Sequence, residues 1–339
     1  MPASSSSKSA AARPVQVALA TYNGERFLAQ QLASLFEQSV QDFTLIVADD
    51  DSTDATMNIL EQFALRYPGR ISIVARGRQP LGPRGNFARL IDAASADYLM
   101  FCDQDDVWLP NKIALSLSKI TKLEGERGCE TPLMVHSDLV MVDEQLDPVS
   151  PSLFAYAAID PSRNDVASLL IRNVVTGCTV LANRALYQAA RPMPAAAIMH
   201  DHWMALVAAS LGSIARLDEP TILYRQHGRN AVGVTSPTHA TLVQRIRKAF
   251  RNNERHLVMW RQSRQAAALL ERCGDRMNQD ARRSTEAYAR LGSTSAWRCL
   301  RDLRRGGLTS LGPLGNLALL LVLLRNPPED FVAGRREQA

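Results

Sequence analysis

The stretch YLMFCDQDD, residues 98–106, places three carboxylates directly behind an apolar run. Its first five residues have the length and composition of a buried β-strand. Asp103, Asp105 and Asp106 follow at the point where such a strand would end. In open parallel sheets, ligands bind just beyond the carboxyl ends of the strands. The stretch therefore predicts a ligand site at one edge of a sheet, provided that other strands run beside it.

Strands and helices are expected to alternate before this stretch. Short apolar runs predict strands at 15–20, 43–48 and 71–75, and apolar residues at helical spacing predict helices at 25–38 and 55–67. This order is typical of an α/β protein with a mainly parallel sheet that is flanked by helices on both faces.

The same pattern continues toward the carboxyl terminus. Residues 77–87, rich in Gly, Pro and Arg, predict a loop, and a helix is expected at 87–94. Later elements are expected as strands at 133–138, 178–182 and 222–227 and as a helix from 200 to about 211.

The acidic turn at 103–106 predicts a metal site. Carboxylates packed this closely repel one another unless a cation or basic groups compensate them. Mg²⁺ and Mn²⁺ prefer oxygen ligands, often one or two carboxylates together with substrate phosphates. A solvated acidic turn is the alternative. The position of the turn behind a buried strand favours the metal.

A second acidic run, Asp49 to Asp51, follows another predicted strand. Carboxylates there could accept hydrogen bonds from a base imide or a ribose hydroxyl, or could cap the next helix. Two acidic strand ends, with Arg78 and Arg84 in or near the loop between them, predict a nucleoside diphosphate held through a metal. No GxGxxG follows the first strand and no P-loop glycines are present, which argues against a dehydrogenase and a P-loop enzyme.

Six segments in this order resemble the family-2 glycosyltransferases, inverting enzymes of the GT-A fold that use nucleotide-sugar donors. The segments are VALATYNG (17–24), VADDDSTD (47–54), DQDDVWLPNK (103–112), TGC (176–178), HDHW (200–203) and YRQHGRN (224–230). Their combination is similar to the rhamnosyltransferase-like branch, which builds bacterial surface polysaccharide. Asp51 departs from the family, which usually has Gly at this place in the turn, where a left-handed backbone is expected.

The resemblance implies a role for each matching residue. The nucleotide would be bound by Thr21, Asn23, Asp50, Arg84, Asn86, Asp103 and Gln104. A divalent cation, Mg²⁺ or Mn²⁺, would be held by Asp103, Asp105, Asp106 and His227. Asp201 matches the catalytic base, which a weakly nucleophilic sugar hydroxyl requires. Because Asp201 begins a predicted helix, the helix dipole is expected to lower its pKa.

The acceptor side is expected to include Gly177, His200, Trp108 and Trp203. Core packing is the alternative for both tryptophans, and a structural role is the alternative for His200. A zinc site at the His-Asp-His triplet is not expected, because no cysteine or third histidine lies at a fitting spacing.

The charge of the chain is divided between its two parts. Residues 1–238 carry 20 Lys and Arg against 25 Asp and Glu, and residues 239–339 carry 19 against 9. Residues 239–260 predict a basic amphipathic helix, which could lie on an anionic membrane or pack on the catalytic domain. The interrupted apolar segment 308–324 could enter the membrane interface. No nucleic-acid motif is present, so no nucleic-acid partner is expected.

The expected organisation is a disordered leader at 1–13, a GT-A catalytic domain at 14–233 and a basic helical extension at 234–339. The longest apolar run, 317–324, is too short to span a bilayer, and five cysteines without a CxxC pair suggest a reducing compartment. Residues 1–14 lack the apolar core of a secretory signal. We therefore expect a cytoplasmic protein, at most peripheral to the inner face of the membrane.

The predicted activity is transfer of a sugar from a dTDP- or UDP-sugar to a glycan or lipid-linked acceptor, with dTDP-rhamnose as the donor that the resemblance favours. A polyprenyl-phosphate sugar synthase shares the early motifs and is one alternative. A non-catalytic protein that binds nucleotide-sugars is the other.

Overall fold

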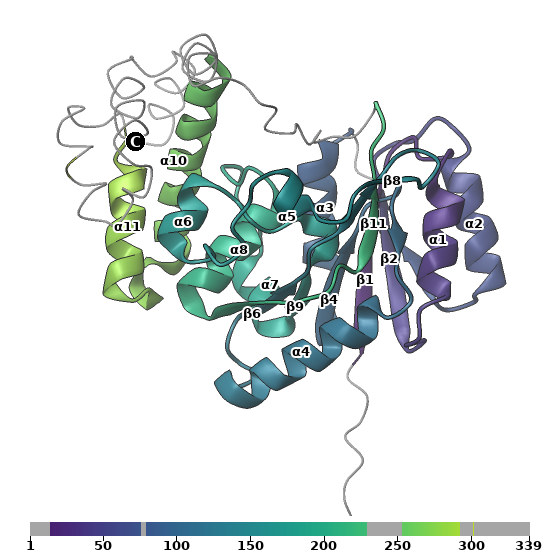
Figure 1. The fold of residues 1–339 in the computed structure, drawn as a ribbon, viewed down its shortest axis with the longest axis horizontal. Helices are drawn as coiled ribbons and strands as arrows, with labels where there is room; N and C mark the ends of the chain where they lie inside the picture. Colours follow the sequence, from purple (N-terminus) through teal and green to yellow (C-terminus); the bar gives the residue numbers. More distant parts are fainter. Residues whose placement is uncertain (1–13, 76–78, 229–252, 292–300, 302–339) are drawn as a thin grey trace, which may run out of the picture.

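The computed structural model describes residues 14–75, 79–228, 253–291 and 301. Its main sheet has seven strands (Figure 1). Across the sheet the order is β10 (Ser213–Arg216), β6 (Leu133–His136), β9 (Leu181–Asn183), β4 (Tyr98–Cys102), β1 (Val15–Thr21), β2 (Phe43–Asp49) and β3 (Ile71–Ile73). All neighbours are parallel except β9, which runs antiparallel to both β4 and β6. The mainly parallel sheet expected from the sequence is confirmed.

A second, four-stranded sheet lies beside the carboxyl end of β4. Its order is β5 (Val107–Trp108), β11 (Ile222–Arg225), β7 (Val140–Val142) and β8 (Pro148–Ser150). Because β5 follows the acidic turn at once and pairs antiparallel with β11, residues 222–225 are brought against that turn. This pairing joins segments that lie more than a hundred residues apart in the chain.

Helices cover both faces of the main sheet (Figure 1). One face carries α1 (Leu28–Phe36), α2 (Thr56–Arg66) and α4 (Lys112–Arg127). The other carries α3 (Gly82–Ala93), α6 (Val166–Ile171), α7 (Arg184–Ala190) and α8 (His200–Leu211). Side chains of β1 alternate between the two cores, with Val17 and Leu19 on the first face and Ala18 on the second. A strand buried on both faces therefore reads as a continuous apolar run.

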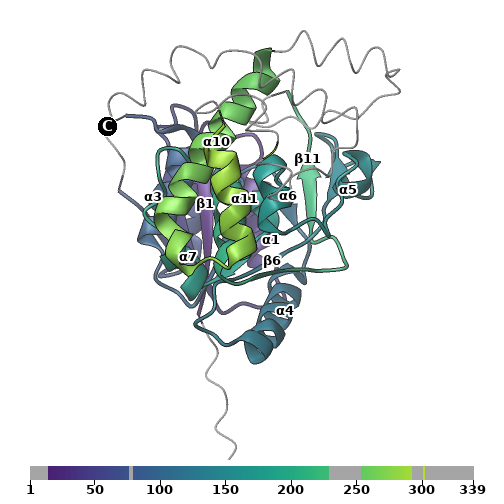
Figure 2. The ribbon, with the colours of Figure 1, turned by 90° about the vertical axis from the view of Figure 1, so that its left-hand side faces the viewer.

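The helices α10 (Asn253–Cys273) and α11 (Gln279–Ala289) form a hairpin against the second face (Figure 2). Trp260, Leu269 and Tyr288 are buried in the same apolar core as Trp203 and Leu206 of α8. The described part of the expected extension thus packs on α6 and α8 of the α/β domain. Residues 239–252 and 308–324 lie outside the described residues, so membrane contact stays a prediction. No helix in the described ranges is long and apolar enough to cross a bilayer.

Two local expectations are wrong. The helix expected at 87–94 begins at Gly82, so that the second half of the expected loop is helical. Pro83 lies in its first turn, where a missing N–H breaks no helical hydrogen bond. The strand expected at 178–182 begins as a 3₁₀ turn, Gly177–Thr179, before the short β9. Asp51 has φ +72°, which confirms the left-handed backbone expected there.

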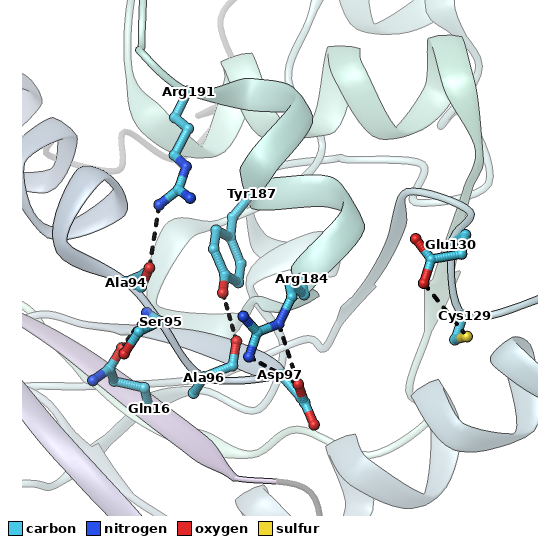
Figure 3. A network of polar contacts seen from close by, with 10 residues as sticks. All are labelled: Gln16, Ala94, Ser95, Ala96, Asp97, Cys129, Glu130, Arg184, Tyr187 and Arg191. Atoms are coloured by element: carbon cyan, nitrogen blue, oxygen red, sulfur yellow. Dashed lines mark hydrogen bonds and ion pairs between the residues drawn. The ribbon is translucent and has the colours of Figure 1, made fainter.

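The amino-terminal end of β4 is fastened to α7 by polar contacts (Figure 3). The hydroxyl of Tyr187 donates to the carbonyl of Ala96, and Arg184 pairs with Asp97 at 3.0 Å. Arg191 donates to backbone carbonyls of the same connection. These contacts lie at the sheet edge opposite the acidic turn, so they fix the fold without occupying the ligand edge.

Candidate active site

A cavity of about 700 Å³ lies at the carboxyl ends of β1, β2 and β4. Nine of the residues predicted from the sequence line it, namely Thr21, Asp50, Asn86, Asp103, Gln104, Asp105, Gly177, His200 and Asp201. The two acidic strand ends therefore border one cavity, at the edge of the sheet where the sequence predicts a ligand site. Residues predicted to bind nucleotide and Asp201, the predicted catalytic base, thus line the same cavity.

Gln104 clamps the acidic turn to the turn after β1. Its amide nitrogen donates to the carbonyl of Tyr22 at 2.9 Å, and its amide oxygen accepts from the Tyr22 N–H at 2.8 Å. A Cβ added to Gly24 would lie 2.3 Å from that oxygen, so the close approach requires glycine. Gln104 thus joins two loops of the cavity rim, and its predicted contact with nucleotide stays a prediction.

Arg225 holds the acidic turn from the side of the second sheet. Its side chain is buried, its Nε donates to the carbonyl of Asp105 at 2.8 Å, and its backbone N–H donates to Asp106 Oδ1 at 3.2 Å. A further guanidinium nitrogen donates to Gln30 Oε1 at 2.6 Å. The role of Arg225 was not predicted, although it stands in the YRQHGRN segment.

Negative charge is concentrated and buried at this turn. Burial, with the neighbouring carboxylates Asp105 and Asp201, raises the pKa of Asp103 to about 7. Burial also raises the pKa of Asp106 well above its usual range. Beneath the turn, burial lowers the pKa of the Lys112 ammonium to about 8. Lys112, like Arg225, had no predicted role, because its burial depends on tertiary packing.

The donor atoms at the turn fit a hard divalent cation. Asp103, Asp106 and Cys178 each offer a ligand atom within 4.8 Å of the others, and Asp106 Oδ2 is buried without a hydrogen-bond partner among the described residues. Asp105 Oδ2 lies 2.9 Å from His227 Nε2. Burial raises the pKa of the Cys178 thiol well above its usual value, which keeps it protonated and a poor ligand. Oxygen donors therefore dominate the set.

Asp201 stands in the first turn of α8. Its Oδ1 accepts the N–H of His202 at 2.7 Å. Burial raises the pKa of Asp201 to about 6 and outweighs hydrogen bonds from His202, Asn173 and Gly177, which lower it. The expectation that the helix dipole would set a lowered pKa is wrong, because desolvation is the larger effect.

His200 is a neutral, buried imidazole on the cavity wall. Its ring stacks on Phe87 with centroids 3.8 Å apart, and burial lowers its pKa to about 3. Both ring nitrogens lack a hydrogen-bond partner within the described part of the chain. A Cβ on Gly177 would lie 2.6 Å from His200 Nε2, so glycine allows the imidazole to stand there. His200 lines the cavity, but both ring nitrogens are closed to solvent in this structure.

Asp50 and Asn86 also line the cavity. The two carboxylate oxygens of Asp50 accept the N–H groups of Leu81 and Gly82 at 2.8 and 2.7 Å, which fixes the start of α3. Asn86 donates its amide to the carbonyl of Ala48 at 2.7 Å. Its Oδ1 is buried and has no hydrogen-bond partner among the residues that the structure describes. Asn86 lines the cavity, and its Oδ1 is closed to solvent in this structure.

The two tryptophans predicted on the acceptor side are core residues, so that prediction is wrong. Trp203 is fully buried, and its indole N–H donates to the carbonyl of Ala190 at 2.8 Å. Trp108 is 2% exposed and lies beneath the ammonium of Lys112, 4.6 Å from the ring centroid. Rings enclosed on both faces cannot stack on a sugar.

Asn23 and Arg84 are placed beside the cavity rather than in its lining. The Oδ1 of Asn23 accepts the N–H of Thr53 at 2.8 Å and so shapes the turn after β2. Arg84 donates to the carbonyl of Ala195 at 3.4 Å, across to the loop before α8. Both side chains shape the rim through these bonds, and their predicted contacts with nucleotide stay predictions.

The close approach of Gln104 to Gly24 predicts a strong coupling between the two positions. We expect Gly24→Ala to lower the free energy of unfolding by about 1–3 kcal/mol, because its Cβ must displace the clamp. In a Gln104→Ala background the same change should cost almost nothing, giving a coupling of at least about 1 kcal/mol in a double-mutant cycle.

Urea unfolding of the four proteins measures this coupling. Gly125→Ala in α4 is the matched control, since its Cβ would meet nothing within 4 Å. That substitution should stabilise the helix by up to about 1 kcal/mol. Additive effects of Gly24→Ala and Gln104→Ala would contradict the clamp.

Comparison with known proteins agrees with this geometry. Residues 16–125 match the family described as glycosyl transferase family 2. A dTDP-rhamnosyl transferase of Shigella flexneri, RfbG, is 45% identical over 98 residues, which are 28% of this chain and 34% of that protein. An amylovoran biosynthesis glycosyltransferase of Erwinia amylovora, AmsB, is 34% identical over 110 residues, 32% of this chain and 36% of that protein. The chain thus spans about a third of the length of each of these relatives.

A solved structure is similar over nearly the whole chain. S. aureus TarS 1–349 in complex with UDP-GlcNAc aligns with a TM-score of 0.53 at 15% identity, covering 96% of this chain and 92% of that one. At this identity the likeness concerns the fold, which is GT-A. Residues 16–125 are thus similar to glycosyl transferase family 2, and the fold that surrounds them is that of GT-A proteins.

Proposed function

We propose that this chain transfers a sugar from a nucleoside-diphosphate donor to a hydroxyl of a glycan or lipid-linked acceptor in polysaccharide synthesis, with inversion at the transferred carbon. The observation that carries the proposal is one cavity that Asp103, Asp105 and Asp201 all line. A carboxylate turn for the diphosphate and a carboxylate base then face the same space. Displacement in one step by a deprotonated acceptor would invert the anomeric centre.

Asp201 is the base in this proposal. A sugar hydroxyl needs a positioned proton acceptor whose pKa lies near the working pH. A pKa of about 6 leaves Asp201 ionised at neutral pH and still able to take a proton as the new bond forms. Hydrogen bonds from His202, Asn173 and Gly177 hold the carboxylate in place.

Asp103, Asp105, Asp106 and His227 would hold a divalent cation, Mg²⁺ or Mn²⁺, and the close approach of Asp103 and Asp106 supports this set. When bound, such an ion supplies electrostatic stabilisation of the leaving diphosphate. Arg225 orients the turn through the carbonyl of Asp105. The ring of His227 packs on Phe27 with centroids 5.0 Å apart, which fixes it beside Asp105.

We infer a dTDP- or UDP-sugar as the donor, and dTDP-rhamnose in particular. The partial likeness to a protein named dTDP-rhamnosyl transferase supports rhamnose. Apolar Leu153, Val175 and Met199 line the cavity together with Asp201, and such side chains suit the methyl group of a 6-deoxy sugar. His200 and Gly177 are proposed on the acceptor side, where the neutral imidazole can bond a hydroxyl.

Two alternatives to this function predict different results in a turnover assay. A polyprenyl-phosphate sugar synthase would turn over the donor with a lipid phosphate as acceptor. A non-catalytic protein would bind the donor without turning it over.

Donor binding is expected to need both nucleotide and cation. We expect one nucleotide class among dTDP-, UDP- and GDP-sugars to raise the melting temperature in thermal shift, with Mn²⁺ or Mg²⁺ present. A ligand at a hundred times its Kd adds about 2.7 kcal/mol of stability. Because protons compete for Asp103, whose pKa is about 7, the cation should bind more weakly as the pH falls from 8 to 6.

Asp105→Ala is the control for this screen and should lose the effect of the cation. A folded protein that responds to no nucleotide, with or without metal, would overturn the transferase proposal.

Asp201→Asn is expected to abolish turnover and to leave donor binding intact. Loss of a positioned base costs about 10²–10⁴-fold in rate. In the wild-type protein the rate should rise with pH through about 6, because only the ionised carboxylate accepts the proton. Nucleoside-diphosphate release from dTDP-rhamnose, or from the UDP-sugar that the screen selects, measures both.

The same variant should gain stability in neutral solution. The folded pKa of Asp201 is raised from 3.8 to about 6, so the ionised side chain weakens the fold above pH 6 and this cost disappears as the pH falls below 3.8. The asparagine removes a cost of about 2–3 kcal/mol at pH 8. Undiminished turnover by Asp201→Asn would disprove the assignment of the base.

A further inference from the structure

The C-terminal hairpin reaches the first turn of α8 through one buried amide. Gln265 lies on α10 and is 1% exposed. Its Oε1 accepts the backbone N–H of Ile198 at 2.8 Å, and its Nε2 lies 3.2 Å from Nδ1 of His202. A side chain from the far end of the sequence thus bonds both sides of the segment that carries Asp201.

The donor and the acceptor in each hydrogen bond of Gln265 follow from the chemistry of the groups that it meets. Since the Ile198 N–H can only donate, the Gln265 oxygen faces it and the Gln265 amide nitrogen faces His202. The amide then donates to Nδ1, so His202 carries its proton on Nε2 and donates to the carbonyl of Leu169 at 2.7 Å. Burial lowers the pKa of His202 to about 4, which keeps the imidazole neutral. Each of these three bonds therefore pairs one donor with one acceptor.

The series spans the two segments that surround Asp201. Ile198 and His202 flank Asp201 in sequence, and the His202 N–H is itself a bond to the Asp201 carboxylate. Leu169 lies on α6, which leads into the stretch from which Asn173 and Gly177 bond Asp201. Gln265 therefore links α10 directly to the segment around Asp201 and, through His202, to α6.

We propose that Gln265 is a positioning residue for Asp201 and that the α10–α11 hairpin is part of the active-site framework. The inference rests on the proposed function, in which Asp201 is the base. Rate depends steeply on such placement, because a displacement of about 1 Å at a reacting group can cost about 10²-fold. An apolar side chain at 265 would leave the Ile198 N–H and His202 Nδ1 without partners and let the turn relax.

The same helix offers a matched control in Gln262. It lies nearly one turn earlier, is also buried, and has two bonds of its own. Its Nε2 donates to the carbonyl of Ile171 at 3.0 Å, and its Oε1 accepts the hydroxyl of Tyr288 at 2.8 Å. One of these bonds meets the end of α6, two residues before Asn173, and the other meets α11, but neither reaches Ile198 or His202, which of the two glutamines only Gln265 contacts.

The experiment compares Gln265→Leu with Gln262→Leu in the full chain. Melting temperature, kcat and KM are measured, with nucleoside-diphosphate release from the donor selected by the thermal-shift screen as the assay. We expect both variants to melt at lower temperature by a similar amount. Only Gln265→Leu should lose kcat, by about 10- to 100-fold, with the KM for the donor almost unchanged, as for an interaction that matters in the transition state.

Gln265→Glu serves if the leucine variant does not fold. It keeps the acceptor for the Ile198 N–H but offers no amide N–H to His202 Nδ1, so kcat should again fall while the KM for the donor stays. Equal kcat values for the variants at 262 and 265 would overturn the inference. Asp201→Asn separates the two proposals: if it is inactive while Gln265→Leu behaves like Gln262→Leu, only the role of Gln265 fails, and if it is active, the base assignment fails.

Discussion

Burial of several carboxylates at the carboxyl end of β4 is the constraint on which the rest of this molecule depends. Moving an ion out of water costs several kcal/mol, and the turn at 103–106 holds three carboxyl groups. The raised pKa values of Asp103 and Asp106 reflect that cost. The second sheet offsets part of this cost, because Arg225 at the end of β11 donates hydrogen bonds to Asp105 and Asp106 of the turn. Asp103 and Asp105 line the cavity, and the unpartnered Oδ2 of Asp106 lies buried beside them.

Features that depend on local pattern could be predicted from the sequence. The strand at 98–102, the helix that begins at residue 200 and the left-handed turn at Asp51 follow from apolar runs, spacing and turn chemistry. The gathering of most site residues around one cavity followed from the rule that parallel strands share an edge, together with the family resemblance.

Features that depend on burial could not be predicted. Whether Trp108 and Trp203 face a ligand or a core is decided by segments far away in the sequence. The pKa of Asp201 shows the same limit, because the helix dipole is visible in the sequence and desolvation is not. The clamps made by Gln104 and Arg225 join loops about 80 and 120 residues apart, and no periodicity marks such pairs.

The hairpin α10–α11 completes one of the two cores, and this has a consequence for the order of events during synthesis on the ribosome. The strands β1, β2 and β4, whose carboxyl ends border the cavity, all lie before residue 106 and can pair soon after they emerge. The apolar surface of α6 and α8 stays uncovered until residues 253–291 have left the exit tunnel, because Trp260, Leu269 and Tyr288 fill it. A nascent chain therefore exposes this apolar surface while up to about eighty residues after α8 are translated, and a chaperone can protect it from aggregation during that interval.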